Sequence, residues 1–246
     1  MPALNTQSIV EEYERDGVVR VPGLFNRDEV AAFRAEIERY IREDLSEKPP
    51  DARTLEPDGV TVRNLWRMEL HHPEFSKMVE NEQIVALAGQ LVHGEPILMA
   101  VETFNKPARV GSGVPYHQDN AYFCQTPPDM LTIWIAMDPV TLENGPVYYI
   151  RGSHKEGMLP TKLSGVKGNS IGLAEAPDVP LSEQFCGLLE PGDALIHQCQ
   201  TIHHSAPNTS EHPRLGLLLV YRGSHTQTDP QLKAAYSVAA AATPPA

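Results

Sequence analysis

Three side chains of the kinds that bind metal ions lie in two short segments far apart in the sequence. His117 and Asp119 are two residues apart in the first segment, and His203 lies in the second. Two histidines and one carboxylate can occupy one face of an octahedral Fe(II) ion and leave the other face open. In an extended segment residues i and i+2 point to the same side, so His117 and Asp119 can reach one ion. On its own this pair is weak evidence, because a surface His–Asp hydrogen bond also explains it in a chain with ten histidines.

Arg214 gives a second chemical signal, 11 residues beyond His203. It precedes an apolar run, residues 215–221, with the composition of a strand. A guanidinium that faces the inside of a barrel needs an anionic partner, because burying an unpaired charge is too costly. The carboxylate of a co-substrate would be such a partner. The alternative is an exposed arginine at the end of a strand.

The composition indicates one globular domain with an acidic surface. A chain of 246 residues can bury one large core, and we expect a single domain over residues 1–238. The net charge of −12 argues against nucleic acid or anionic lipid as a partner, because both require clustered Lys and Arg. No apolar run approaches the ~18 residues that a transmembrane helix needs, so no membrane partner is expected. We expect a small-molecule partner and a monomer or homodimer.

The cysteines and the N-terminal residues indicate the cellular compartment. Cys124, Cys186 and Cys199 are odd in number and form no CxxC pair, which argues against a disulfide framework and a zinc-finger site. Residues 1–5 lack the basic and apolar regions of a signal peptide. We therefore expect free thiols in a reducing cytoplasm.

The pattern of apolar residues places most of the helices before most of the strands. Helical spacing predicts helices over 8–14, 26–42 and 80–92, and the polar, proline-rich residues 46–60 are predicted to form a loop. Alternation predicts a short strand at 18–21 and further strands at 97–104, 131–137, 146–150, 194–198 and 215–222. This order predicts an α+β, mainly β domain built on a sandwich or barrel.

Two segments fall outside that pattern. Residues 157–183 are rich in Gly and Pro with weak periodicity, so we expect a long insertion that acts as a lid or binding loop. Residues 239–246 form a low-complexity tail that we expect to be disordered.

Six ordered motifs resemble the phytanoyl-CoA dioxygenase family of Fe(II)/2-oxoglutarate-dependent oxygenases, which includes the ectoine hydroxylases. The motifs are FNKP at 104–107, PYHQDN at 115–120, WIAM at 134–137, ENGP at 143–146 with RGSH at 151–154, PGD at 191–193, and HHSAPN at 203–208 with Arg214. The resemblance covers roughly residues 8–225. It implies a double-stranded β-helix, a cupin-like jelly roll with N-terminal and flanking helices, and carries no information on the substrate.

The resemblance implies that His117, Asp119 and His203 are the iron ligands and therefore the catalytic residues. The family form is a histidine followed two residues later by a serine. Ser205 stands at that position relative to His203, so the family form selects His203 over its neighbour His204. His204 would face the opposite side if the chain is extended here.

The same resemblance implies how 2-oxoglutarate is bound. Arg214 would pair with its distal carboxylate, an interaction for which the planar guanidinium is suited. Ser205 would donate a hydrogen bond to that carboxylate. Lys106 would be a second cationic contact, and Trp134 would form a wall of the pocket.

The cofactors implied by the resemblance are Fe(II), 2-oxoglutarate and O2. The implied reaction hydroxylates an unactivated C–H bond of a small-molecule metabolite and releases succinate and CO2. Asp119 favours hydroxylation over halogenation, because halogenating relatives carry a small residue at this position. The alternative is a cupin-like barrel that binds a metal or ligand without 2-oxoglutarate or without catalysis, and both Arg214 and Lys106 argue against it.

Residues near the expected barrel mouth are the candidates for substrate binding. They are Asn120, Tyr122, Glu102, Arg63 and Trp66. Packing or solvent exposure is the alternative explanation for each of them. The chain has no evident basic patch for the phosphates of coenzyme A.

Overall fold

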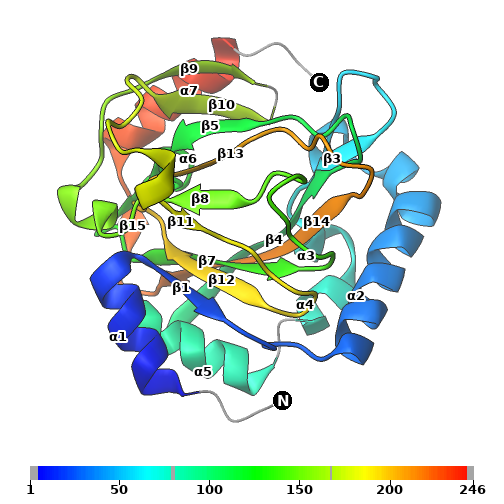
Figure 1. The fold of residues 1–246 in the computed structure, drawn as a ribbon, viewed down its shortest axis with the longest axis horizontal. Helices are drawn as coiled ribbons and strands as arrows, with labels where there is room; N and C mark the ends of the chain where they lie inside the picture. The colour runs from blue at the N-terminus through cyan, green and yellow to red at the C-terminus, as the bar shows by residue number, and fades with distance from the viewer. Residues whose placement is uncertain (1–4, 79–80, 167, 243–246) are drawn as a thin grey trace.

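The computed structural model describes residues 5–78, 81–166 and 168–242, which form two main antiparallel sheets with helices around them (Figure 1). Among these residues the larger sheet has seven strands, in the order β1 (Val18–Val21), β12 (Ala194–Gln198), β7 (Met130–Ala136), β14 (Arg214–Gly223), β4 (Pro96–Lys106), β3 (Val62–Leu65) and β2 (Arg53–Leu55). The smaller sheet has the order β11 (Phe185–Cys186), β8 (Val147–Tyr149), β13 (His203–Ser205) and β5 (Val114–His117).

Side chains alternate along the strands of the larger sheet, so each strand contributes to two different faces. In β7, Leu131, Ile133 and Ile135 pack into the main hydrophobic core, together with residues of the helices. Thr132 and Trp134 of the same strand line a cavity that residues of the smaller sheet also line. Alternate residues of β7 therefore line the space between the two sheets.

Helices supply the other side of the main core and surround the larger sheet in Figure 1. They are α1 (Thr6–Asp16), α2 (Arg27–Arg39), α3 (Met68–His71), α4 (Pro73–Met78) and α5 (Glu82–Leu91). The helix α2 begins with a capping box, in which Asn26 and Glu29 each accept a hydrogen bond from the backbone N–H of the other. Within the described ranges no helix combines the length and the apolar character needed to cross a bilayer.

Short helical turns complete the connections between these elements. The π-helical turn Tyr40–Asp44 extends α2. The 3₁₀ turns are Leu45–Glu47, Pro50–Ala52, Ser153–Glu156 and Leu181–Glu183.

A hairpin and the last helix lie together at one end of the barrel, at the top of Figure 1. The hairpin consists of β9 (Thr161–Val166) and β10 (Asn169–Leu173), and the last helix is α7 (Pro230–Ala242). The short helix α6 (Asn120–Phe123) packs beside α7, and β6 (Gln125–Thr126) pairs with β15 (Gln227–Thr228). Tyr236 and Ala239 of α7 pack against Ala121 and Ile171, so α7 is attached to both α6 and the hairpin.

The strands and the N-terminal helices agree with the sequence prediction, but three segments differ from it. The predicted loop 46–60 contains the edge strand β2, which pairs with β3. The predicted insertion 157–183 contains the β9–β10 hairpin. The predicted tail starts inside α7, because Ala239 is buried and the helix continues to residue 242. Residues 243–246 of that tail and residue 80 of the predicted helix 80–92 lie outside the described residues.

Candidate active site

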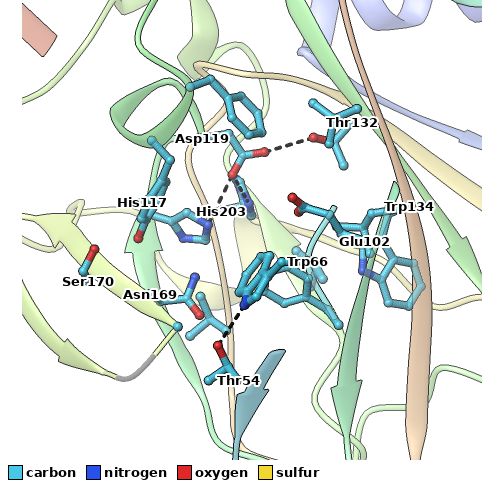
Figure 2. Close-up of a pocket in the computed structure, with 18 of the residues that line it drawn as sticks. Thr54, Trp66, Glu102, His117, Asp119, Thr132, Trp134, Asn169, Ser170 and His203 are labelled. Carbon is cyan, nitrogen blue, oxygen red and sulfur yellow. Dashed lines mark hydrogen bonds and ion pairs between the residues drawn. The ribbon is translucent and has the colours of Figure 1, made fainter. Parts of the chain in front are cut away.

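The centre of the site is the triad of His117, Asp119 and His203, at one end of β5 and β13 (Figure 2). The pairing of β5 with β13 places His117 directly opposite His203, and Asp119 follows at the start of α6. Asp119 Oδ1 lies 3.5 Å from Nε2 of each histidine. The three ligand atoms lie within 4.8 Å of one another, an arrangement that no other set of His, Cys, Asp and Glu forms among the described residues. The structure thus brings the three predicted ligands together.

Backbone carbonyls hold both imidazoles with Nε2 directed toward Asp119. Nδ1 of His117 lies 2.9 Å from the carbonyl oxygen of Pro115, and Nδ1 of His203 lies 2.9 Å from that of Thr201. Because a carbonyl only accepts, each Nδ1 carries a proton, which leaves Nε2 as the ring atom directed at the centre of the triad. Burial, followed by repulsion from His117, holds the pKa of His203 well below its ordinary value. His203 is therefore neutral, the form in which an imidazole binds a divalent metal ion.

Two residues outside the triad fix the second oxygen of Asp119. Thr132 Oγ1 donates to Oδ2 at 3.2 Å, and His197 Nε2 lies 3.1 Å from the same oxygen. His197 Nδ1 in turn lies 3.2 Å from the hydroxyl of Tyr149. Burial alone would raise the pKa of Asp119, but the surrounding imidazoles lower it well below the ordinary value. Asp119 is therefore an ionised carboxylate whose Oδ1 is directed at the two histidines.

The contact between His197 and Asp119 gives a testable prediction. His197→Phe keeps an aromatic ring beside Tyr149 but removes the hydrogen-bond donor to Asp119. Such outer contacts contribute roughly 10- to 100-fold in metal affinity, so we expect Fe(II) to bind about 10-fold more weakly. Anaerobic titration of the metal-free protein with Fe(II) measures the change, and Thr132→Val should shift the affinity in the same direction. Equal Fe(II) affinity in both variants and the wild type would contradict a role for these contacts.

Two buried cations, Arg214 and Lys106, lie on neighbouring strands of the larger sheet. They are direct cross-strand partners on β14 and β4, so their side chains share one face. Both residues are 2% exposed. Arg214 Nη1 donates to the carbonyl oxygen of Gly145 at 2.7 Å, and its guanidinium lies 5.0 Å from the ring centroid of Trp134. Lys106 Nζ donates to the carbonyl oxygen of Ala206.

These cations have no anionic partner within the described ranges. The Nε atom of Arg214 is buried and lacks a hydrogen-bond acceptor there. Burial lowers the pKa of Arg214 to about 10, and burial together with repulsion from Arg214 lowers the pKa of Lys106 to about 6. A carboxylate would supply both the missing acceptor and the missing negative charge. The orphaned Nε therefore fits the distal carboxylate of 2-oxoglutarate.

One cavity of 660 Å³ connects the triad with Arg214. Trp134 and Ser205 also line it, as the sequence predicted, whereas Lys106 is not a lining residue and points at the carbonyl of Ala206. Pockets for small ligands have volumes of roughly 300–1,000 Å³. The cavity therefore has room for 2-oxoglutarate and a small substrate side by side.

Three of the five predicted substrate-binding residues line this cavity, namely Glu102, Tyr122 and Trp66. Figure 2 shows Glu102 and Trp66. The indole of Trp66 donates to Thr54 Oγ1 at 2.9 Å, and the hydroxyl of Tyr122 donates to the carbonyl of Ile171. These bonds fix the two aromatic rings as walls and leave the Glu102 carboxyl as the polar group of this set.

The structure places the other two predicted residues in the scaffold. The side chain of Asn120 donates to the carbonyl of Gln125 and accepts from its N–H, so it closes the turn after α6. Arg63 is buried outside the cavity lining and donates to the Gly113 carbonyl at 3.3 Å and to Asn169 Oδ1 at 3.2 Å. Both residues thus shape the site without facing its cavity.

The sequence did not predict the contacts that His197, Thr132 and Tyr149 make in the site. Their signal in the sequence is a polar residue on the inward-facing alternation of a buried strand, such as Thr132 between Leu131 and Ile133. By contrast, the choice of His203 over His204 agrees with the structure. His204 stacks on Tyr116, with ring centroids 3.9 Å apart, and does not belong to the triad.

Sequence comparison decides the family of this chain. The sequence model described as "Phytanoyl-CoA dioxygenase (PhyH)" matches residues 13–216, a range that contains the triad and Arg214. The chain belongs to this family. The resemblance carried by the six motifs is therefore confirmed.

Curated relatives from several bacteria support the same assignment. An ectoine dioxygenase of Stutzerimonas stutzeri is 27% identical over 228 residues, which cover 87% of this chain and 75% of the relative. An L-proline trans-4-hydroxylase of Streptomyces griseoviridis is 28% identical over 238 residues, covering 89% of this chain and 87% of the relative.

Solved structures support the fold. The α-ketoglutarate-dependent epimerase SnoN from nogalamycin biosynthesis superposes with a TM-score of 0.72 at 25% identity, covering 92% of this chain and 85% of SnoN. EctD from S. alaskensis with 2-oxoglutarate and 5-hydroxyectoine gives a TM-score of 0.74 at 20% identity, covering 90% of this chain and 77% of EctD. The predicted jelly-roll fold and the predicted oxygenase class are confirmed. Iron and 2-oxoglutarate, the predicted cofactors, are named with solved neighbours of this chain.

Proposed function

We propose that this protein hydroxylates a C–H bond of a small metabolite with Fe(II), 2-oxoglutarate and O2, and releases succinate and CO2. The observation that carries the proposal is that one cavity contains both a metal-binding triad and a buried arginine that could bind a carboxylate. The triad His117, Asp119 and His203 lines this cavity. Arg214 lines it too, and its buried Nε lacks a hydrogen-bond acceptor among the described residues. Relatives that hydroxylate small molecules, such as the L-proline trans-4-hydroxylase, make a small-molecule substrate the natural choice.

The residues of the site have separate roles in the proposed reaction. When bound, iron and 2-oxoglutarate together supply an oxidant made from O2. His117, Asp119 and His203 would hold the metal ion and would leave positions on it for the co-substrate and oxygen. Arg214 and Ser205 orient the distal carboxylate of the co-substrate, so its reacting end is directed at the triad. Leu218 and Val220 line the cavity and exclude water from it.

Lys106 acts from behind the cavity wall in this proposal. Its ammonium is bound to the Ala206 carbonyl, next to the strand that carries Ser205. It fixes the backbone that follows Ser205, and a bound carboxylate would favour its ammonium form and so gain a second positive charge at this end of the cavity. This assigns Lys106 a supporting role beside the direct contact from Arg214.

An anaerobic titration tests the proposal directly. Protein with Fe(II) and 2-oxoglutarate should develop the weak visible metal-to-ligand charge-transfer band of a chelated 2-oxo acid. Admission of O2 with a panel of small polar metabolites should then release succinate in proportion to hydroxylated product. Folded, iron-loaded protein that gives no such band would contradict the proposal and would instead favour a cupin-like barrel that does not use 2-oxoglutarate.

A further inference from the structure

The side chains that face the cavity change in character along β4. Lys106, Phe104 and Glu102 alternate on the inward face of this strand, and their partners on β14 are Arg214, Gly216 and Leu218. The strand rises about 3.3 Å per residue, so Glu102 lies about 13 Å along the strand from Lys106. One end of the cavity wall thus has Arg214, with Lys106 behind it, and the other end has the Glu102 carboxyl.

The Glu102 carboxyl points into the cavity, beside the triad (Figure 2). No hydrogen bond or ion pair joins it to another side chain or to the backbone in the part of the chain that the structure describes. Enclosure by the barrel, followed by repulsion from Asp119 and Glu69, raises the pKa of Glu102 to about 8. Arg67, at the rim of the cavity, forms its ion pair with Glu69 instead. Among the described residues no cation therefore forms an ion pair with this carboxyl, although the charge of Arg67 partly opposes the rise in its pKa.

Aromatic rings surround the part of the cavity into which Glu102 points. Trp66 and Phe104 form an edge-to-face pair with centroids 5.4 Å apart, and Tyr122 and Tyr236 form another at 6.0 Å. All four line the cavity. Aromatic faces attract cations, most strongly where water is excluded. Lys233 Nζ lies 5.1 Å from the ring centroid of Tyr236 and so already occupies that ring. Trp66 and Phe104 beside the Glu102 carboxyl therefore form the wall that suits a protonated amine.

One of these walls lies outside the region that the family model matches. Tyr236, Lys233 and Ala240 line the cavity from α7, whereas the match ends at residue 216. Tyr236 is near enough to Glu102 for the carboxylate to contribute to the raised pKa of the phenol, after burial and Cys124. This end of the cavity is therefore closed by an element that the family match does not include.

We propose that Glu102 is the specificity-determining residue of the site and binds a protonated amine of the substrate, so that the substrate is a cationic or zwitterionic small molecule. This inference rests on the proposed function, because it places the substrate beside the triad. A buried carboxylate is stable only with a counter-ion, and a protonated nitrogen supplies both the charge and the hydrogen bonds. A hydroxyl group supplies hydrogen bonds alone.

A matched pair of probes tests the inference without knowledge of the substrate. Cyclohexylamine is a cation at neutral pH, and cyclohexanol is its uncharged counterpart of equal size. Saturation-transfer NMR measures the dissociation constant of each probe with metal-free protein. The shift of the anaerobic charge-transfer band on adding each probe reports binding beside the metal. Because the NMR measurement needs no metal, absence of the band would count against the proposed function and leave the amine preference measurable.

The wild type should bind cyclohexylamine about 10-fold or more tightly than cyclohexanol, as expected for a charged hydrogen bond in an enclosed site. Glu102→Gln should abolish this preference while the band with 2-oxoglutarate persists. Glu175→Gln, an exposed acid outside the cavity lining, removes the same unit of charge and should keep the preference. The inference is overturned if the wild type has no preference, if Glu102→Gln retains it, or if Glu175→Gln loses it equally.

Discussion

His117→Ala is expected to reduce turnover to below about 1% of the wild type and to weaken Fe(II) binding by at least about 100-fold. Outer contacts to a metal ligand are already worth roughly 10- to 100-fold in affinity, and this change removes a ligand itself. The imidazole donates from Nδ1 to the Pro115 carbonyl and otherwise faces Asp119, so little packing depends on it beyond the site. The protein should therefore stay folded while it loses the metal. Fe(II) titration without oxygen and succinate release with oxygen measure the two effects.

His212→Ala is the matched control for this experiment. His212 is exposed and does not line the cavity of the triad, although it lies on the same connection as His203 and Arg214. Its removal should change neither Fe(II) affinity nor succinate release. Unchanged turnover in His117→Ala would refute the assignment of the triad, and circular dichroism of both variants separates loss of metal from loss of fold.

The core of the site could be predicted because its residues are constrained within short segments. The family form, a histidine followed two residues later by a serine, selects His203, and the alternation of an extended segment then directs His204 to the opposite side. The sequence left open whether Arg214 is buried or exposed at the end of its strand, and the structure shows that it is buried. A short extended motif fixes the relative directions of its own side chains.

Contacts that depend on the order of strands in the sheet could not be predicted. His197 reaches Asp119 only because β12 pairs with β7, which places His197 beside Thr132. No local pattern in residues 194–198 records that pairing. The same holds for Glu102, whose lone position becomes evident only when all the walls of the cavity are in place.

Side-chain direction explains why Asn120 and Arg63, which were predicted to bind the substrate, do not line the cavity. Asn120 adjoins a metal ligand in sequence, but the chain turns into α6 there and directs the amide at the backbone of Gln125. The low-complexity composition of α7 suggested a disordered tail, but this alanine-rich helix packs against α6 and the β9–β10 hairpin. Nearness in sequence and ordinary composition are therefore weak guides to what faces the cavity.

Arg214→Met should abolish the response of the protein to 2-oxoglutarate and leave it at least as stable without this co-substrate. In the wild type, 2-oxoglutarate at 100 times its dissociation constant should stabilise the metal-loaded fold by about 2.7 kcal/mol. Loss of a buried charge contact weakens binding by about 100-fold, which leaves a stabilisation of about 0.4 kcal/mol at the same concentration. Thermal unfolding with and without 2-oxoglutarate measures the difference.

The stability of Arg214→Met in the absence of 2-oxoglutarate separates a co-substrate clamp from a structural arginine. The guanidinium is buried, its Nε lacks an acceptor among the described residues, and its charge opposes protonation of Lys106, its cross-strand partner. Replacing such a group by an apolar side chain of similar length is neutral or stabilising, by about 1 kcal/mol or more. Arg222→Met on the same strand is the control, because Arg222 donates to the carbonyl of Thr226 at 3.0 Å and should lower stability while the 2-oxoglutarate response persists. If Arg214→Met unfolds at a lower temperature and still responds to 2-oxoglutarate, Arg214 holds the barrel together and the co-substrate is bound elsewhere.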